Sequence, residues 1–272
     1  MLDVMSQAKN AIEAYNSALK ITSSNIANMS VPGYKKLGVS FQSIFERILS
    51  QGTAAENDMG GTNPRQLGQG MSISNIAVDF SNGETTSGSS LDLAIRGSGL
   101  FMVSPDGGNS YLYTRAGNFQ IDALGNLTSN GMQVYGLDNS DNLVPISGLT
   151  GSKINYRWLS NGRLQYSATP DNPDSFTNEK FRIALTFFSN PSGLAQAQGT
   201  SFAETLASGS PASAQAPGGA VGSVSTGQIE QSNVFYLGET IAALELQRAM
   251  TGNLSIIKMA SDIISNFIQK LG

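Results

Sequence analysis

The segment NIANMSVPGYKK, residues 25–36, ends a helical pattern and divides the chain into its predicted parts. Upstream of it, mostly apolar side chains recur alternately every three and four residues over 5–26, which is the spacing of a coiled-coil seam. Pro32 and Gly33 end this pattern, because proline cannot continue the helical hydrogen bonds and glycine favours a reversal of the chain. The spacing therefore predicts an N-terminal helix that stops here, and a second helix is expected over 39–49.

The C-terminal end carries a matching pattern. No proline occurs over 233–271, and apolar residues recur there at helical spacing with a shift near Arg248 that is typical of a stutter. A helix of nearly forty residues would be about 55 Å long. The residues expected to form helix seams are Ile12, Leu19, Ile26, Leu237, Ile241, Leu244, Leu254, Ile257, Ile264 and Ile268. Two interpretations stay open: the two ends pair as a helical hairpin within one chain, or both pack mainly against copies in neighbouring subunits.

The middle of the chain reads as β structure. Short runs of alternating apolar residues recur about every ten residues between Gly- and Asn-rich turns, which favours an antiparallel sandwich or barrel. The expected fold class is α+β. The predicted parts are an N-terminal helical segment over 1–50, a connecting loop over 51–69, a central β domain over 70–205, a Gly/Ala/Ser/Pro-rich connection over 206–228 and a C-terminal helix over 229–272. The second connection suits a flexible linker or an extended return segment.

Composition excludes several classes of function. The 272 residues contain no Cys and no His, which removes Cys and His nucleophiles, the Ser-His-Asp triad, histidine bases and the common zinc sites. A net charge of −4 argues against electrostatic binding of nucleic acid. No apolar run approaches a membrane span, and the first residues lack the pattern of a cleaved secretion signal. Only 13 % of the residues are charged, against about 25 % in typical domains, so the surface favours packing against other protein.

Candidate chemical motifs are weak. The RGSGLF motif at 96–101 lacks the third glycine and following helix of a dinucleotide site, so a kink between strands is favoured. Four aspartates in turn-like motifs suggest calcium, but the full binding loop is missing and solvated turns are favoured: Asp138, Asp141, Asp171 and Asp174. Asp92 has no partner acid or base nearby in the sequence, so a structural role is favoured over a catalytic one. No catalytic, cofactor or metal site is therefore predicted.

Four sequence blocks resemble signature motifs of the flagellar axial proteins, which form the bacterial rod and hook. They are SSNIANMSVPGYKK, LDLAIRGSGLFMV, YTRAGNFQIDALGNL and IEQSNVFYLGETIAALELQRAM, in the order of the family and over about a third of the chain. The central matching residues are Asn25, Ala27, Asn28, Gly33, Tyr34, Lys35, Arg115, Gly117, Ser232, Asn233, Val234, Gln247 and Arg248. Glu230 and Glu239 also fit the last block, whereas Val31-Pro32 and Leu100 depart from the usual residues.

The resemblance implies a structural, non-enzymatic subunit of the flagellar basal body that needs no cofactor. Such a subunit is exported unfolded through the flagellar type III apparatus, without a cleaved signal, and polymerises into a hollow helical tube. The implied partners are copies of itself, neighbouring rod and hook proteins, the export apparatus and bushing rings around the rod. Within the family the single middle domain resembles the rod members, most of all those of the distal rod. The region 148–179 departs from that pattern, so a proximal rod protein and a short hook subunit stay open.

A rival interpretation is a secreted adhesin or carbohydrate-binding β protein whose helices form trimers. It requires an exposed aromatic cluster, for which the candidates are Trp158, Tyr156 and Tyr166. Fixed trimers would distinguish it from an open-ended polymer.

Overall fold

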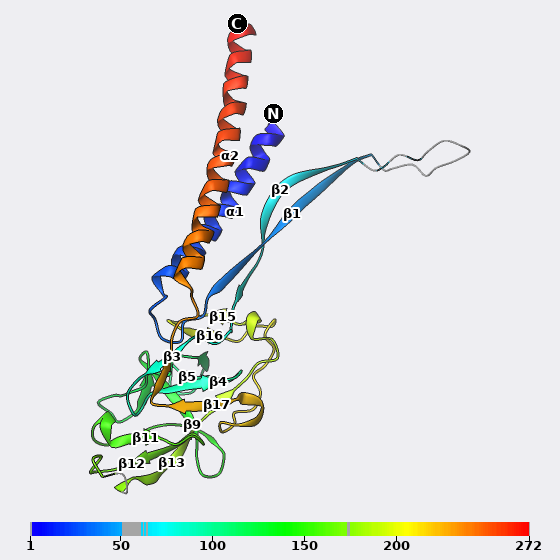
Figure 1. Cartoon of the computed structure of the whole chain (residues 1–272). Helices are drawn as coiled ribbons and strands as arrows, with labels where there is room; N and C mark the ends of the chain where they lie inside the picture. The colour runs from blue at the N-terminus through cyan, green and yellow to red at the C-terminus, as the bar shows by residue number, and fades with distance from the viewer. Residues whose placement is uncertain (1, 51–60, 62, 64, 173–174, 272) are drawn as a thin grey trace. The chain divides into compact units, whose positions relative to one another are not determined.

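The computed structural model describes residues 2–50, 61, 63, 65–172 and 175–271 (Figure 1). Internal contacts divide the chain into two compact units. The helical unit contains residues 1–26, 37–76 and 236–272, and the β unit contains 27–36 and 77–235. The chain thus has a helix at each end and an antiparallel β-rich centre, which confirms the predicted α+β class.

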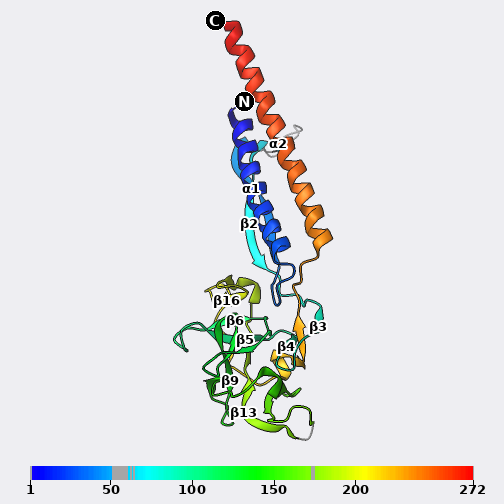
Figure 2. The ribbon, with the colours of Figure 1, turned by 90° about the vertical axis from the view of Figure 1, so that its left-hand side faces the viewer.

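The helical unit is built from two long helices and a hairpin. Helix α1 spans Leu2–Ala27, α2 spans Tyr236–Leu271, and the hairpin pairs β1 (Leu37–Ser50) with β2 (Arg65–Val78). The helices have 26 and 36 residues, hence lengths of about 39 and 54 Å. They run antiparallel side by side, and α2 continues beyond the N-terminal end of α1 (Figures 1 and 2).

The face that α1 buries consists of small and polar side chains at helical spacing. Its buried residues are Ala8, Ala11, Ala14, Ala18, Thr22 and Asn25. The hairpin also contacts this helix: the Gln7 side-chain amide donates a hydrogen bond of 2.8 Å to the Gly68 carbonyl, and the Tyr15 and Phe41 rings meet edge to face at 5.9 Å. Small side chains let the backbone of a neighbouring element approach α1 closely, so this face packs through close backbone contact rather than through large side chains.

The helix expected over 39–49 is wrong, because this segment lies in strand β1. Its apolar residues Phe41, Ile44 and Ile48 fit a helical stripe, but β-branched and aromatic residues suit a strand equally well. The pairing with β2, distant in the sequence, decides between the two. The predicted connection over 51–69 lies mostly outside the described residues, and its residues 65–69 belong to β2.

The β unit contains one large branched antiparallel sheet. Twelve strands belong to it, with β11, β12, β13, β9, β5, β6, β16 and β15 as its main path. The main-path strands are β5 (Leu100–Ser104), β6 (Leu112–Thr114), β9 (Met132–Leu137), β11 (Tyr156–Trp158), β12 (Arg163–Tyr166), β13 (Thr177–Ile183), β15 (Ala195–Gln196) and β16 (Ser201–Ala203). The side strands are β7 (Gln120–Ile121), β8 (Leu127–Ser129), β10 (Leu143–Pro145) and β14 (Leu185–Thr186). The described residues of the unit also include short 3-10 turns at η1 (Lys153–Asn155), η3 (Pro191–Gly193) and η4 (Gly219–Val221).

The last part of the β unit pairs with its first part. Strand β17 (Ser223–Thr226) is antiparallel to β4 (Leu93–Arg96), and β18 (Gln228–Glu230) is antiparallel to β3 (Thr85–Ser87). These two pairs return the chain to the entrance of the unit just before α2 begins. The favoured kink between strands is confirmed at 97–99, which joins β4 to β5.

The Gly/Ala/Ser/Pro-rich stretch over 206–228 follows an extended path that is held by hydrogen bonds. Leu185 and Gln215 form an antiparallel bridge, and the Thr186 hydroxyl donates to the Ala212 carbonyl at 2.6 Å. Val221 is fully buried, and β17 and the first residue of β18 belong to the same stretch. The flexible-linker interpretation is therefore wrong, and the stretch is an ordered return segment.

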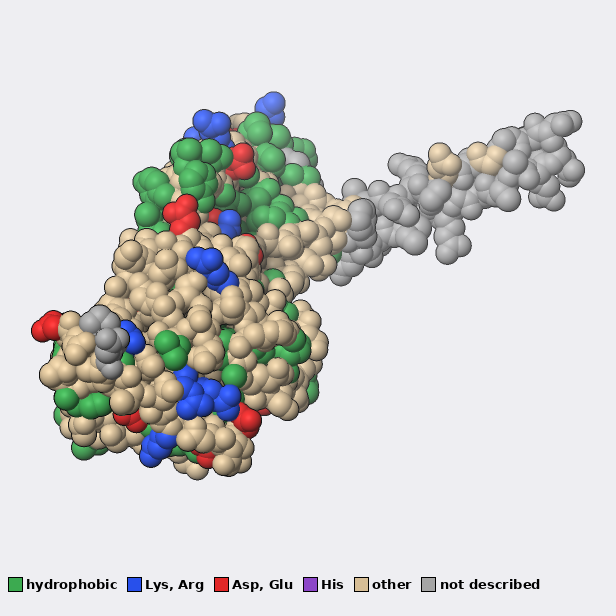
Figure 3. All heavy atoms as spheres, turned by 60° about the horizontal axis from the view of Figure 1, so that its bottom comes forward, with side chains coloured by type: hydrophobic (Ala, Val, Ile, Leu, Met, Phe, Trp, Pro, Cys, Tyr) green, Lys and Arg blue, Asp and Glu red, His purple; other side chains and the backbone are tan. Residues whose placement is uncertain are grey.

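The core of the β unit encloses the single tryptophan of the chain. Trp158 is 3 % exposed, and its indole N–H donates to the Leu91 carbonyl at 2.8 Å. Tyr156 is also buried and Tyr166 is partly buried, so the three residues do not form the exposed aromatic cluster that an adhesin requires. On the face of the β unit in Figure 3, hydrophobic and charged side chains are scattered.

Candidate functional site

The motifs from the start, middle and end of the sequence meet at one buried carboxylate in the β unit. The Lys35 ammonium lies 2.6 Å from Glu230 Oε1, and Arg115 Nη1 lies 3.2 Å from Glu230 Oε2. All three side chains are at most 1 % exposed. We call Lys35, Arg115 and Glu230 the ionic cluster. It joins the segment after α1, the strand region around β6 and the end of β18.

Backbone groups satisfy much of the remaining hydrogen-bonding capacity of the ionic cluster. Lys35 Nζ also donates to the Ser81 carbonyl at 2.6 Å, and the Gly83 N–H donates to Glu230 Oε1 at 3.0 Å. The Arg115 guanidinium donates to the Gly97 carbonyl. These bonds, together with the ion pairs, fix the orientation of each charged side chain.

Burial sets the electrostatics of the cluster. Desolvation lowers the pKa of Lys35 and that of Arg115, and the Glu230 carboxylate opposes the shift in both cases. A buried ion pair contributes little net stability relative to apolar packing, but removing one partner leaves an uncompensated charge at high cost. We therefore interpret the cluster as a device that selects one arrangement of three chain segments.

Gly33 brings the first motif against the third. Its φ is +70°, which favours glycine, and its N–H donates to the Glu230 carbonyl at 2.9 Å. A Cβ atom at this position would lie 2.3 Å from the Ala116 nitrogen, so a side chain does not fit. Gly117 is equally confined, because its Cβ would lie 1.7 Å from the Leu93 carbonyl oxygen.

Asn233 holds together the two segments that lead to the helices. Its Oδ1 accepts a hydrogen bond of 2.7 Å from the Lys36 N–H, and its Nδ2 donates to the Asp79 carbonyl at 2.8 Å. The neighbouring Ser232 hydroxyl accepts from the Val234 N–H at 3.2 Å. The last block of matching residues therefore fixes the exit of the β unit against its entrance.

A second buried polar contact lies in the helical unit. Asn25 donates to Glu239 Oε2 at 3.1 Å and exchanges two hydrogen bonds of 3.0 Å with the backbone of Leu37. Asn25 is 1 % exposed and Glu239 is 3 % exposed. Glu239 also lies in the first turn of α2, where the helix dipole favours a negative charge. This contact joins the end of α1, the start of β1 and the start of α2.

Sequence reasoning assigned no role to Glu230 or Glu239, although both match the C-terminal block. Each is a carboxylate among mainly uncharged neighbours in the sequence, and this isolation is the feature by which the sequence could have indicated a role. Among the other matching residues, Asn28 is half-buried, and Ala27, Gln247 and Arg248 are exposed. Tyr34 is buried and Val234 is half-buried.

Half of the ten predicted seam residues stay exposed in the single chain. Ile12, Leu19, Ile26, Ile257 and Ile264 are half-buried. Five others on α2 are 49–64 % exposed, namely Leu237, Ile241, Leu244, Leu254 and Ile268. Their role in contacts with neighbouring subunits stays a prediction.

The aspartates considered for catalysis or metal binding serve turns and loops. Asp92 is buried, accepts a hydrogen bond from the Ser89 N–H at 2.6 Å and lies 3.5 Å from Lys153 Nζ. Asp138 accepts from the N–H groups of the turn that follows it, whereas Asp174 lies outside the described residues. Within the described part of the chain, no group of three or more acidic residues is placed to hold a metal ion. No described helix is long and apolar enough to cross a membrane.

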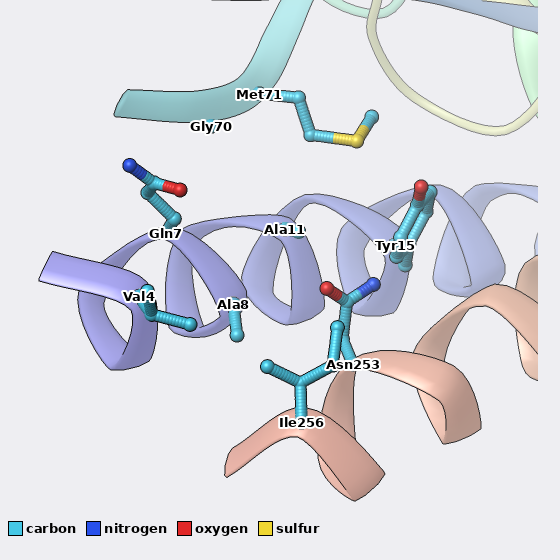
Figure 4. A pocket seen from close by; sticks show the side chains of 9 residues that line it. All are labelled: Val4, Gln7, Ala8, Ala11, Tyr15, Gly70, Met71, Asn253 and Ile256. Carbon is cyan, nitrogen blue, oxygen red and sulfur yellow. The ribbon is translucent and has the colours of Figure 1, made fainter. Parts of the chain in front are cut away.

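A groove of about 340 Å³ lies within the helical unit (Figure 4). Its lining comes from three elements: Val4, Gln7, Ala8, Ala11 and Tyr15 of α1, Gly70 and Met71 of β2, and Asn253 and Ile256 of α2. None of these side chains is charged. We call this feature the helical groove, and its composition suits an apolar side chain.

Comparisons with known proteins match both ends and the centre of the chain. The family model described as "Flagella basal body rod protein" matches residues 5–35, and that described as "Flagellar hook protein FlgE/F/G D1 domain" matches residues 94–155. The flagellar basal-body rod protein FlgG of Bacillus subtilis (strain 168) is 30 % identical over 271 residues, 98 % of either chain.

Two further relatives show how far the similarity to a rod protein and to a hook protein extends along the chain. FlgG of Buchnera aphidicola subsp. Acyrthosiphon pisum is 26 % identical over 265 residues, 96 % of this chain and 97 % of the relative. The flagellar hook protein FlgE of Helicobacter mustelae is 35 % identical over 133 residues, 48 % of this chain and 29 % of the relative. The similarity to the rod proteins therefore extends over the whole length, whereas the similarity to this hook protein covers about half of the chain.

Proposed function

The chain belongs to the family of flagellar basal-body rod proteins and is a structural subunit of the flagellar rod, and on this premise we propose that its copies polymerise into a hollow helical shaft. In this proposal the shaft transmits motor torque and conducts exported subunits through its centre. The role is mechanical and requires no catalysis. Full-length similarity to rod proteins supports a rod subunit over the alternative of a short hook subunit.

The observation that carries the proposal is the apolar surface of α2. Large apolar side chains along this helix are about half exposed or more, among them Leu237, Leu244 and Leu254. Exposed apolar patches of this extent mark contacts with other proteins. Neighbouring subunits that bury these residues would order the helices during assembly, and contacts that do not close into a ring produce a filament.

We place the subunit in the distal rod, where the resemblance puts an extension at the position of 51–69. Strands β1 and β2 lead to that region, which is consistent with this position. The proximal rod is the alternative. We further propose export through the type III apparatus without a cleaved signal, a position across the cell envelope, and contacts with neighbouring rod and hook proteins and with the bushing rings.

Circular dichroism and sedimentation of the purified chain at rising concentration test the proposal. We expect the helical signal to increase as large open-ended polymers appear, because neighbours bury the apolar faces of α1 and α2. Full helicity in a monomer, or in a trimer of fixed mass, would contradict coupled folding and assembly and would favour the adhesin-like alternative.

Leu244→Asp is expected to abolish polymerisation and leave the β unit folded. Leu244 is 54 % exposed in the single chain, so a carboxylate there stays hydrated in the monomer. In a buried contact between subunits the same charge would be desolvated without a partner. Sedimentation measures polymer, and fluorescence of the buried Trp158 reports the fold of the β unit.

Thr251→Asp is the matched control, because Thr251 is an exposed polar residue on the same helix and lies outside the family motif. It introduces the same charge and should polymerise at close to the wild-type concentration. Normal filaments from the Leu244→Asp chain would exclude this part of α2 from the contacts between subunits.

A further inference from the structure

The last turns of α2 carry a row of large exposed apolar side chains. Met259, Ile263 and Phe267 are 57–65 % exposed and follow one another at intervals of four residues. Side chains at this interval form a ridge along a helix surface, of the kind that packs into a groove on another helix. We call these three residues the C-terminal ridge.

Helix α1 of the same chain does not cover the C-terminal ridge. The helices are antiparallel, and at the groove Val4 and Ala8 of α1 lie with Ile256 of α2. The ridge starts at Met259, three residues further toward the C-terminus, and α2 as a whole continues past the N-terminal end of α1 (Figures 1 and 2). The ridge is therefore available to another molecule.

The helical groove has small residues along part of its lining and, like the ridge, carries no charge. Ala8, Ala11 and Gly70 contribute almost no side-chain volume to the groove, whereas the ridge presents Met, Ile and Phe. A Cβ atom on Gly70 would lie only 3.1 Å from the Gln7 carbonyl oxygen, so glycine keeps β2 close to α1 there. Neither surface carries a charged residue, and large side chains against small ones give interdigitated packing.

The ridge cannot enter the groove of its own chain. Ile256 lines the groove and Phe267 lies about 16 Å further along the same continuous helix, so α2 would have to fold back on itself. A second copy of the chain meets no such restriction. The two surfaces differ, so each copy offers one to each of two neighbours, and such contacts produce an open-ended chain of subunits when they do not close into a ring.

We propose that the C-terminal ridge of one subunit packs into the helical groove of the next. This inference rests on the proposed polymerisation and adds the pair of surfaces that meet. It assigns Phe267 as the residue that fills the groove, and Met71 as part of the wall that receives it.

Cysteine cross-linking tests the pairing directly, because the natural chain contains no cysteine. In polymers of the double variant Met71→Cys/Phe267→Cys, mild oxidation should give a ladder of dimers, trimers and larger species on a non-reducing gel. A disulfide requires Cα atoms within about 7 Å, and Phe267 lies about 16 Å along α2 from Ile256, which lines the groove together with Met71, so we expect no bond within one chain. The same variant kept dilute should stay monomeric after oxidation.

Met71→Cys/Ser265→Cys is the matched control, since Ser265 is exposed on the same turns of α2 but lies off the ridge. Its cross-linked fraction should be about tenfold lower, because its sulfur atoms do not meet the geometric requirement. Equal ladders from the two variants would overturn the pairing.

A charge on the ridge provides an independent measurement. Phe267→Asp should raise the concentration needed for polymerisation at least about tenfold, because the carboxylate would be buried without a partner, whereas Ser265→Asp should leave it unchanged. Normal assembly of Phe267→Asp, with no specific cross-link, would overturn the ridge and groove while leaving the rod function intact. Failure of the unmodified chain to form any polymer would overturn both proposals.

Discussion

Glu230→Gln is expected to lower the free energy of unfolding of the β unit by about 3–5 kcal/mol. The amide has nearly the shape of the carboxylate, so packing is kept while the only negative charge of the ionic cluster is lost. Lys35 and Arg115 then remain buried without a counter-charge, and their desolvation is uncompensated. Denaturant unfolding followed by Trp158 fluorescence measures the effect, because this single tryptophan lies in the core of the β unit.

Two further variants isolate the electrostatic cause. Glu84→Gln makes the same chemical change at an exposed position of the same unit and should shift the unfolding midpoint little. Lys35→Met should cost less in the Glu230→Gln chain than in the wild type, because the cation that it removes has already lost its partner. Additive losses in this cycle, or an unchanged midpoint for Glu230→Gln, would contradict a coupled buried cluster.

Gly33→Ala is expected to destabilise the β unit by about 3 kcal/mol, from two separate costs. A non-glycine residue at φ +70° is strained, and the added methyl group would collide with the backbone of Ala116 at 2.3 Å. Arg115 precedes that alanine, so relief of the clash would also displace the ionic cluster. Trp158 fluorescence during denaturation is again the measurement.

Gly209→Ala separates strain from collision. Gly209 has φ +71°, but a Cβ atom there would meet nothing within 4 Å. It should cost only the backbone strain, about 1 kcal/mol. If both alanine variants unfolded at the same midpoint, close packing of Gly33 against Ala116 would not be important for the fold.

Local sequence patterns identified the two terminal helices, because their secondary structure does not depend on a partner strand. Helix α1 ends at Ala27, a few residues before Pro32 and Gly33, and α2 follows the apolar spacing through its shift near Arg248. The segment of strand β1 fits a helix by the spacing of Phe41, Ile44 and Ile48, although aromatic and β-branched residues suit a strand equally well. Only pairing with β2 decides between them, and no local pattern contains that information.

The ionic cluster shows the same limit for the site. Lys35 and Arg115 were identified by resemblance, but their shared partner Glu230 lies 195 residues from Lys35 in the sequence. The face that α1 buries was also missed, because alanines such as Ala11 and Ala18 give a weak hydrophobic signal. Local patterns indicate which side chains are apolar enough to be buried, whereas the topology decides which segment buries them.

The ion pair between Lys35 and Glu230 also lowers the entropic cost of bringing α1 and α2 together during folding. Asn25 and Glu239 are 214 residues apart, and closing a flexible loop of that length costs about 5 kcal/mol of entropy. Once Lys35 is held at Glu230, only ten residues on one side and nine on the other separate the cluster from that contact. The entropic cost falls by about 2 kcal/mol, equivalent to a roughly 30-fold higher effective concentration of one helix around the other. If the β unit folds first, it shortens the loop between α1 and α2, and the two ends of the chain then form their contact at the lower entropic cost of a short loop.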